Sequence, residues 1–387
     1  MRVERQRSIL LTPAVEDYTW MLANRDMRTS LQSFGDFQAD SLKETGQAGE
    51  CQVNETFERI ESTAQYCGFS LSHFAAIGDG KKNWKSSLMI EATVRPIGGE
   101  MDSLETLLDR CGGENQLTEE LTNLYGGPLA FERRSEARPF VVVNFVTTIE
   151  GLTSYGIPEK AGGGWISGFN KQDVFIMGLL RSFADGVAVG ANTLRSEPEH
   201  LWTSEFIDKD HETEFVKLRE SLGKSRKNPV QIFVTSSGNV LDNMKNLPNA
   251  FLAPEVETLI VTTEKGKNVV EKEFKKFSVF PGILVANRVE KPNEVNIPMM
   301  MNRLLRDYEI EFLLIEGGSG FNGSVTHAEQ YDEYFQAISP KIIGTDKNNP
   351  RQISVSGFER SPENSLPHNL ISVKNHKNYL FLRWRLN

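Results

Sequence analysis

Apolar runs of strand length recur along the chain from about residue 138 onward. Each run is nearly continuous rather than alternating, which is typical of a strand buried on both faces. The connections are long enough for helices, and 170–184 and 298–308 carry apolar residues at helical spacing, with Asn170 as an N-cap. Strands that alternate with helices predict an α/β fold with a mostly parallel sheet flanked by helices. The predicted strands are 141–146, 185–190, 229–237, 257–263, 282–288 and 311–316.

Two other segments depart from this pattern. The C-terminal residues 370–386 predict two strands joined at Asn375–Asn378, which form an antiparallel hairpin on a sheet edge. Residues 102–110 and 117–125 predict short helical pieces, which the sequence Gly126-Gly127-Pro128 ends.

The first hundred residues differ in character from the rest. Positions 24–56 are polar and lack periodicity, so we expect them to be mobile or loosely packed. Segments 68–77 and 87–97 predict two strands around a turn. We therefore expect an N-terminal extension of unknown role and partly disordered over 1–100, a lead-in segment over 101–137 and the α/β domain over 138–387.

Composition and charge narrow the classes of protein. The 387 residues carry a net charge of -9, which argues against a nucleic-acid binder because such proteins need a basic face. No apolar run approaches the roughly 20 residues that cross a bilayer, and the N-terminus does not predict a secretory signal. Cys51, Cys67 and Cys111 lie far apart without a CxxC pair, so neither a zinc ribbon nor a disulfide framework is expected. These features favour a cytoplasmic protein without membrane or nucleic-acid partners.

A glycine motif follows the strand predicted at 311–316. Gly318, Gly320 and Gly323 have the spacing G-x-G-x-x-G directly after this strand and open a short helix predicted at Phe321–His327. Glycines allow a pyrophosphate to approach the backbone, and helix N-terminal amides face its charge; an ordinary glycine-rich turn explains the motif equally well. The acidic residue that usually binds the ribose about 20 residues later is missing. Lys341 stands in that region and would tolerate a 2′-phosphate.

Two further strand ends carry candidate chemistry. Gly190 ends a buried strand and Thr193 falls in the next helical turn, which suits either phosphate binding or ordinary capping. Two glycine turns at the carboxyl ends of strands in one sheet favour a dinucleotide in the crevice there. Asn144 interrupts an apolar strand, so its amide needs hydrogen-bond partners. Glu150 lies just after this strand and could be a general acid, a substrate anchor or a solvated turn residue. His327 and Glu329 have the His-x-Glu spacing of zinc deaminases, but no Pro-Cys-x-x-Cys motif follows them, so no metal is expected.

These segments together resemble the reductase domain of riboflavin biosynthesis, in the dihydrofolate-reductase-like superfamily. The resemblance covers roughly 138–387 and lies in RPFVVVNFVTTIEG, in GGWISGFNKQDVFIMGLLRSFADGVAVGANTLRSEP, and in FLLIEGGSGFNGS followed by YDEYFQAISPKIIG. It implies a reductase that takes hydride from NADPH, similar to the 5-amino-6-(5-phosphoribosylamino)uracil reductase, and by analogy a homodimer. The cofactor side would be formed by Gly190, Thr193, Thr235, Ser237, Glu316, Gly317, Gly318 and Gly320, and the substrate side by Asn144, Thr148, Glu150, Ser167, Arg195 and Glu197.

Two departures from the family pattern bear on the substrate. Glu150 replaces the usual Asp, and Glu197, Glu199 and His200 stand where the riboflavin enzymes carry residues suited to a ribose phosphate. A phosphate beside two glutamates would be repelled, so we expect hydride transfer to the C=N or C=O carbon of a different small molecule. Glu150 or an ordered water would supply the proton.

The deaminase half of the bifunctional enzymes is absent from this sequence. A non-catalytic nucleotide-binding protein on the same fold remains the main alternative to a reductase. A methyltransferase is a weaker alternative, because it would not need the second turn at Gly190 and Thr193.

Overall fold

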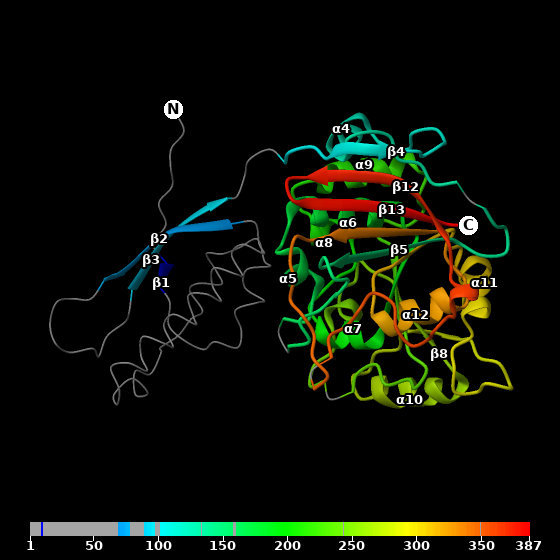
Figure 1. The fold of residues 1–387 in the computed structure, drawn as a ribbon. Coiled ribbons are helices and arrows are strands. Elements are labelled where there is room, and N and C mark those ends of the chain that lie inside the picture. The colour runs from blue at the N-terminus through cyan, green and yellow to red at the C-terminus, as the bar shows by residue number, and fades with distance from the viewer. Residues whose placement is uncertain are drawn as a thin grey trace. The chain divides into compact units, whose positions relative to one another are not determined.

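The computed structural model describes residues 9–10, 69–77, 89–96, 101–132, 134–157, 160–242, 244–348 and 350–387. The chain divides into two compact units, Met1–Glu100 and Met101–Asn387, which are described one at a time (Figure 1).

The first unit contains a small antiparallel sheet. Its strands β1 (Ile9–Leu10), β2 (Phe69–Ile77) and β3 (Met89–Pro96) lie in the order β1-β3-β2. β2 and β3 pair from Phe69 opposite Pro96 to Ile77 opposite Met89, which confirms the two strands predicted in this region. The turn between them and the polar segment 24–56 lie outside the described residues.

The second unit is built on a sheet whose described strands have the order β4-β12-β13-β11-β5-β10-β6-β7-β8-β9. Neighbours from β11 to β9 run parallel, whereas β13, β12 and β4 are added antiparallel at one side. The predicted fold class, a mostly parallel sheet with a C-terminal antiparallel hairpin, is therefore confirmed. The strands are β4 (Glu105–Asp109), β5 (Phe140–Thr147), β6 (Gly186–Gly190), β7 (Val230–Val234), β8 (Thr258–Thr262), β9 (Gly282–Val285), β10 (Phe312–Ile315), β11 (Glu333–Ile338), β12 (His368–His376) and β13 (Tyr379–Leu386).

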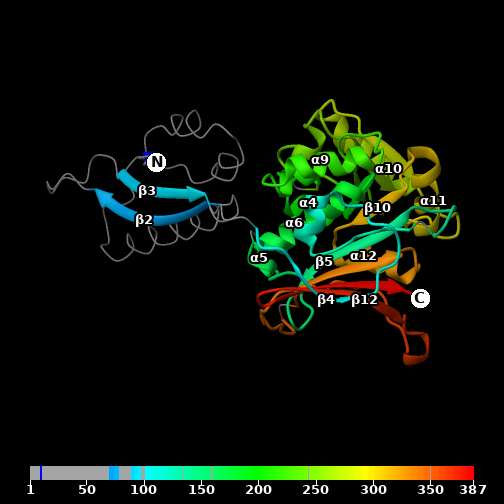
Figure 2. The ribbon, with the colours of Figure 1, turned by 90° about the horizontal axis from the view of Figure 1, so that it is seen from above.

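Helices cover both faces of this sheet, and a separate apolar core lies under each cover. α6 and α9 pack together on one side and bury Phe175 and Phe215, while α11 and α12 bury Met300 and Val325 in the other core (Figure 2). Strands covered on both faces must be apolar on both faces, which explains their continuous apolar runs. The helices are α4 (Glu119–Tyr125), α5 (Gly163–Ser167), α6 (Lys171–Phe183), α7 (Ala191–Ser196), α8 (Ser204–Ile207), α9 (Glu212–Ser221), α10 (Glu264–Lys275), α11 (Ile297–Tyr308) and α12 (Ser319–His327), with 3₁₀ turns η3 (Asn249–Phe251) and η4 (Pro362–Asn364).

The helix predicted after Asn170 begins as its capping residue requires. The Asn170 side chain accepts a hydrogen bond from the backbone N–H of Asp173, and the helix continues to Phe183. None of the helices in the described part of the chain is long and apolar enough to cross a membrane.

One segment predicted as helical is a strand. Residues 102–110 contain β4, which pairs antiparallel with β12, and Arg110 N–H donates to Ile371 O at 2.8 Å. A short isolated helix is marginal in water, whereas pairing with the sheet edge satisfies the same backbone groups. The following piece is a helix, α4, and it buries Leu121 and Tyr125 in the core of the second unit.

Candidate functional site

The carboxyl ends of β5, β10, β6 and β7 meet along one edge of the sheet. β10 lies between β5 and β6 and runs parallel to both. The chain leaves β5 toward α6, which packs in one core, and leaves β10 toward α12, which packs in the other. Adjacent parallel strands whose connections leave to opposite faces form a switch point, where ligands of open α/β sheets bind.

At this edge the two glycine turns are in direct contact. Gly190 N–H donates to Gly317 O at 2.8 Å, and Glu316 N–H donates to Ala188 O at 3.1 Å. A Cβ on Gly318 would lie 3.2 Å from Thr193 Oγ1, so only a residue without a side chain fits here without displacing Thr193. Gly317 has a φ of 129°, in the region that favours glycine, and its peptide bond to Gly318 is cis. The structure therefore brings the turn at Gly190 and Thr193 into contact with the turn at Gly317 and Gly318.

The other two glycines of the motif at Gly318 have different surroundings. A Cβ on Gly320 would meet no atom within 4 Å, so this first turn of α12 has free space beside it. A Cβ on Gly323 would lie 1.7 Å from Ser356 O. Gly323 is therefore required by the close approach of the backbone at Ser356, not by a ligand.

Glu316 is held in a buried ion pair. Arg181 of α6 donates from Nη2 to Glu316 Oε2 at 2.7 Å, and the two side chains are 1% and 7% exposed. The same guanidinium donates to Leu201 O and Thr203 O. The ion pair thus joins α6 to the end of β10, and Arg181 also binds the segment after α7. Sequence reasoning missed Arg181, although an arginine on a helix otherwise facing the core was a signal of a buried partner.

A second carboxyl that sequence reasoning missed lies at the start of α6. Asp173 is buried, and its backbone N–H donates to the Asn170 side chain at 3.0 Å. Burial raises the pKa of Asp173 most, Ser167 lowers it, and the charge of Glu316 raises it, so that the pKa is about 7. In the sequence, an Asp in a first helical turn is explained by capping alone, so no local signal separated it from a surface residue.

The segment after the Gly190 turn is more enclosed than its polar sequence indicates. Burial raises the pKa of Glu197, and the opposing effect of the Arg181 charge is smaller. A Cβ on Gly162 would lie 2.4 Å from Glu197 Oε1. Burial also holds the pKa of His200 well below its usual range, so this histidine is neutral. Arg195 donates to Asn192 Oδ1 and Asn239 O.

Glu150 lies in the turn after β5, where it joins two loops. Desolvation opposes its ionisation, but hydrogen bonds from Thr148 and from the N–H groups of Ile343 and Gly344 lower the pKa of Glu150 to about 2. It is therefore a carboxylate at neutral pH. This geometry does not suit the predicted role of Glu150 as a proton donor, because the proton is lost far below neutral pH.

The remaining predicted residues are spread along the same edge. Asn144 is half-buried in β5, opposite Phe335 of β11. Thr235 Oγ1 accepts from Gly238 N–H and Ser237 Oγ from Asn239 N–H, just after β7 and next to the strand of Gly190. Within the described residues no group of three or more His, Cys, Asp or Glu is placed to hold a metal ion, and the ring of His327 lies against Phe358.

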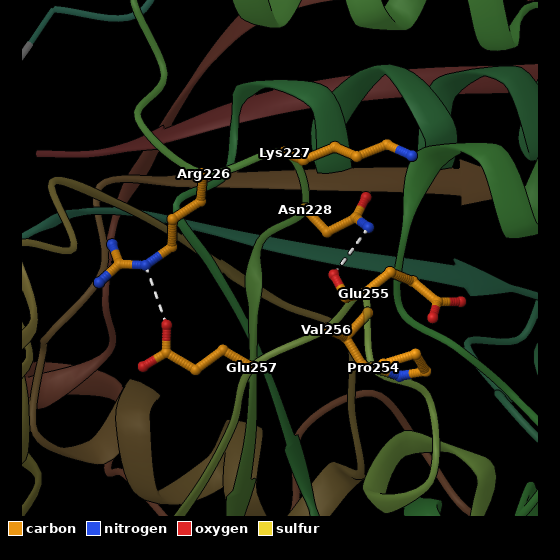
Figure 3. Close-up of a pocket in the computed structure, with 7 residues that line it drawn as sticks. All are labelled: Arg226, Lys227, Asn228, Pro254, Glu255, Val256 and Glu257. Carbon is orange, nitrogen blue, oxygen red and sulfur yellow. Dashed lines mark hydrogen bonds and ion pairs between the residues drawn. The ribbon is translucent and has the colours of Figure 1, made fainter.

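A surface hollow lies at the opposite edge of the sheet (Figure 3). It is formed by residues 226–228, which precede β7, and 254–257, which precede β8, and an Arg226–Glu257 ion pair of 3.1 Å crosses it. None of the predicted site residues lines this hollow.

The fold and the paired glycine turns define an α/β domain in which the carboxyl ends of parallel strands form the candidate binding edge. The chain belongs to the RibD C-terminal domain family, which matches residues 139–375. The resemblance seen in the sequence is therefore confirmed, and family membership supports a reductase of the riboflavin-biosynthesis type.

Individual relatives are distant. The chain is 27% identical over 209 residues to the 2,5-diamino-6-ribosylamino-4(3H)-pyrimidinone 5′-phosphate reductase of Methanothermobacter thermautotrophicus, covering 54% of this chain and 80% of that protein. Among solved structures, Acinetobacter baumannii RibD is 15% identical with a TM-score of 0.44 and coverage of 65% of this chain. This chain spans 59% of the length of that RibD chain. A pyrimidine reductase-like protein of Corynebacterium diphtheriae is 18% identical with a TM-score of 0.47, covering 64% of this chain and 92% of its own.

Proposed function

We propose that this protein is an NADPH-dependent reductase that transfers hydride to the C=N or C=O carbon of a small molecule. The observation that carries the proposal is the contact between the Gly190 and Gly317-Gly318 turns at the switch point of the sheet. Such a place exposes backbone N–H groups to a dinucleotide phosphate and lets the ligand approach closely. The reductase class of the family supports the same reaction.

The residues present fit this cofactor. A side chain on Gly318 would fill the space beside Thr193, and Gly320 borders open space at the start of α12. We therefore assign NADPH binding to Gly190, Thr193, Gly317, Gly318 and Gly320, with Thr235 and Ser237 further along the edge. When bound, the dihydronicotinamide supplies the hydride, and the protein contributes position and a dry environment. Glu316 acts indirectly, through its ion pair with Arg181.

We propose a substrate without a phosphate group. At the place where the riboflavin enzymes carry phosphate-binding residues, this chain has Glu197 and Glu199, and the guanidinium of Arg195 is bonded to Asn192 and Asn239. A phosphate has a charge of roughly -2 and needs Arg or Lys donors. Asn144, Thr148 and Ser167 would complete the substrate side.

The test measures NADPH binding by fluorescence titration, followed by NADPH oxidation with a panel of imines and carbonyl compounds. The pyrimidinone phosphate of the archaeal relative is included in the panel. We expect NADPH binding and turnover of uncharged compounds in preference to the phosphate. Binding without turnover on any compound would favour the non-catalytic nucleotide-binding alternative. Efficient reduction of the phosphate would contradict the proposed substrate class.

We also propose that the protein is a cytoplasmic homodimer. Light scattering after size-exclusion chromatography should then give a mass near twice 43.6 kDa. A mass of one chain across a range of concentrations would contradict the dimer, and recovery of the protein in a membrane or secreted fraction would contradict the location.

A further inference from the structure

Arg181 is a buried arginine whose hydrogen-bond acceptors come from two separate segments of the chain. Its side chain is 1% exposed. Nε donates to Glu316 Oε1 at 3.0 Å and Nη2 to Glu316 Oε2 at 2.7 Å. Nη1 donates to Leu201 O at 3.3 Å and Thr203 O at 3.0 Å, and Nη2 also lies 3.0 Å from His200 Nε2. A guanidinium has five N–H donors, so each of them has an acceptor here.

The acceptors of this guanidinium flank both glycine turns. Glu316 is the residue directly before Gly317. The segment 200–203 follows α7, the helix that begins at the Gly190 turn, and α6, which carries the arginine, leads into β6, the strand that ends at Gly190. One side chain therefore bonds to the strand end before one turn and to the segment that follows the other.

The two turns touch each other closely, so their spacing matters for any ligand that bonds to both. Gly190 N–H donates to Gly317 O at 2.8 Å, and a Cβ on Gly318 would lie 3.2 Å from Thr193 Oγ1. A binding group that moves by about 1 Å can lose roughly a hundredfold of its effect. A buried ion pair adds little net stability compared with apolar residues of the same volume. Its contribution here is therefore to the geometry of the turns.

We propose that Arg181 is a positioning residue for NADPH binding, which fixes the spacing of the Gly190 turn and the Gly317-Gly318 turn so that both bind the same dinucleotide. This inference rests on the proposed function. Arg181 acts through Glu316 and through the segment 200–203, because its own donors are all used within the protein.

The first part of the test needs no cofactor. A guanidinium only donates, so His200 Nε2 must be an acceptor and the ring proton must lie on Nδ1. Nitrogen-15 NMR of the full chain with labelled histidine should show a neutral His200 ring with an unprotonated Nε2. Its signals are assigned by their loss in His200→Gln. A proton on Nε2 would mean that the bond from Arg181 does not form, and it overturns the inference.

The second part measures NADPH affinity by fluorescence titration in Arg181→Lys. A lysine keeps the positive charge beside Glu316, but its compact ammonium cannot bond to the acceptors on both sides. We expect a loss of at least tenfold, about 1.4 kcal/mol. The matched control is Arg383→Lys. Arg383 is also 1% exposed, pairs with Glu333 at 2.6 Å and donates to Ala130 O at 2.7 Å, but it lies in the C-terminal hairpin. This variant should lose stability in urea unfolding and keep its NADPH affinity within about twofold.

Hydrogen exchange with and without NADPH gives the third measurement. The cofactor should slow exchange of the N–H groups of 200–206 in the unmodified protein and in Arg383→Lys, but not in Arg181→Lys. A loss of affinity smaller than tenfold in Arg181→Lys overturns this inference, and so does unchanged exchange in the unmodified protein. Either result leaves the reductase function standing. If Arg181→Lys does not fold, exchange in the unmodified protein decides. Failure of the unmodified protein to bind NADPH overturns both proposals.

Discussion

Glu150 and Asp173 are both carboxyl groups of the candidate site, but their surroundings move their pKa values in opposite directions. Glu150 accepts hydrogen bonds from Thr148 and two backbone N–H groups, which favours the charged form. Asp173 is buried beside the negative charge of Glu316, which favours the neutral form. Two carboxyls whose pKa values are driven apart are the usual basis for assigning different roles in acid–base chemistry.

The raised pKa of Asp173 predicts a dependence of stability on pH. Between about pH 4, where an unfolded Asp titrates, and about pH 7, where Asp173 titrates when folded, the folded protein binds one more proton than the unfolded chain. Stability therefore falls as pH rises through this window and levels off above it. Asp173→Asn should remove this fall and be more stable at pH 8 by about 1–4 kcal/mol. Urea unfolding at a series of pH values measures it, and parallel curves for the two proteins would contradict the burial of a protonated carboxyl.

Gly318 provides a prediction about the cofactor. A valine there would place its Cβ 3.2 Å from Thr193 Oγ1 and its methyl groups in the space assigned to the dinucleotide. We expect Gly318→Val to lose at least tenfold in NADPH affinity, about 1.4 kcal/mol, while the sheet stays folded. Fluorescence titration measures the loss. Gly112→Val is the matched control, because a Cβ on Gly112 would meet no atom within 4 Å. Gly112 also lies far along the chain from the site residues. Unchanged NADPH binding in folded Gly318→Val would remove this strand end from the site.

At the scale of elements, the ion pair between Arg181 and Glu316 joins helix α6 to the end of strand β10. Both side chains are almost completely buried, so removing one partner leaves an uncompensated charge. We expect Arg181→Leu to lower the free energy of unfolding by about 3–5 kcal/mol.

The matched control is Arg303→Leu, which breaks the pair with Asp307 on the surface of α11, where the two side chains are 43% and 41% exposed. This change should cost at most about 1 kcal/mol, because exposed ion pairs contribute little. Chemical unfolding of both variants measures the difference. A loss of stability in Arg181→Leu as small as that in Arg303→Leu would contradict the prediction, because it would mean that Glu316 is not left as an uncompensated buried charge.

For the whole molecule, the start of the second unit is decided by contacts that residues 101–137 make with the C-terminal hairpin. Lys374 of β12 is 1% exposed and donates to Thr106 Oγ1 at 2.7 Å and Gly126 O at 3.2 Å. Arg383 of β13 donates to Ala130 O at 2.7 Å, and its guanidinium carbon lies 4.7 Å from the ring centre of Phe131. These lysine and arginine contacts make the lead-in segment part of the packed unit.

We therefore propose that residues 101–387 fold without the N-terminal hundred and that a chain beginning at Arg138 does not fold stably. The shorter chain would expose the edge of β12 and leave the buried ammonium of Lys374 without Thr106 and Gly126. Arg383 would keep its ion pair with Glu333 but lose its hydrogen bond to Ala130 O. Circular dichroism and thermal unfolding of the two truncated chains, with the full chain as reference, measure this. An unfolded 101–387 chain would show that the first unit supports the core, and a stable 138–387 chain would show that these contacts are dispensable.

Local sequence patterns predict much of the fold. The apolar runs predict β5, β6, β7, β8 and β10, because a strand covered on both faces must be apolar throughout, and the Asn170 cap marks the start of α6. The glycine turns could also be found, because a glycine directly after such a strand is visible in the sequence.

The charged partners could not be found in this way. Glu316 meets Arg181 across 135 positions of the chain, and that contact exists only because β10 is inserted between β5 and β6. The strand order likewise brings the charge of Glu316 close enough to raise the pKa of Asp173, and β4 forms a strand by pairing with the edge of β12. The spacing of apolar residues along one helix or strand indicates which of its side chains are buried, because one element has one buried face or two. Which groups are buried together depends on the order in which the elements pack, and this order sets the charge of each site residue.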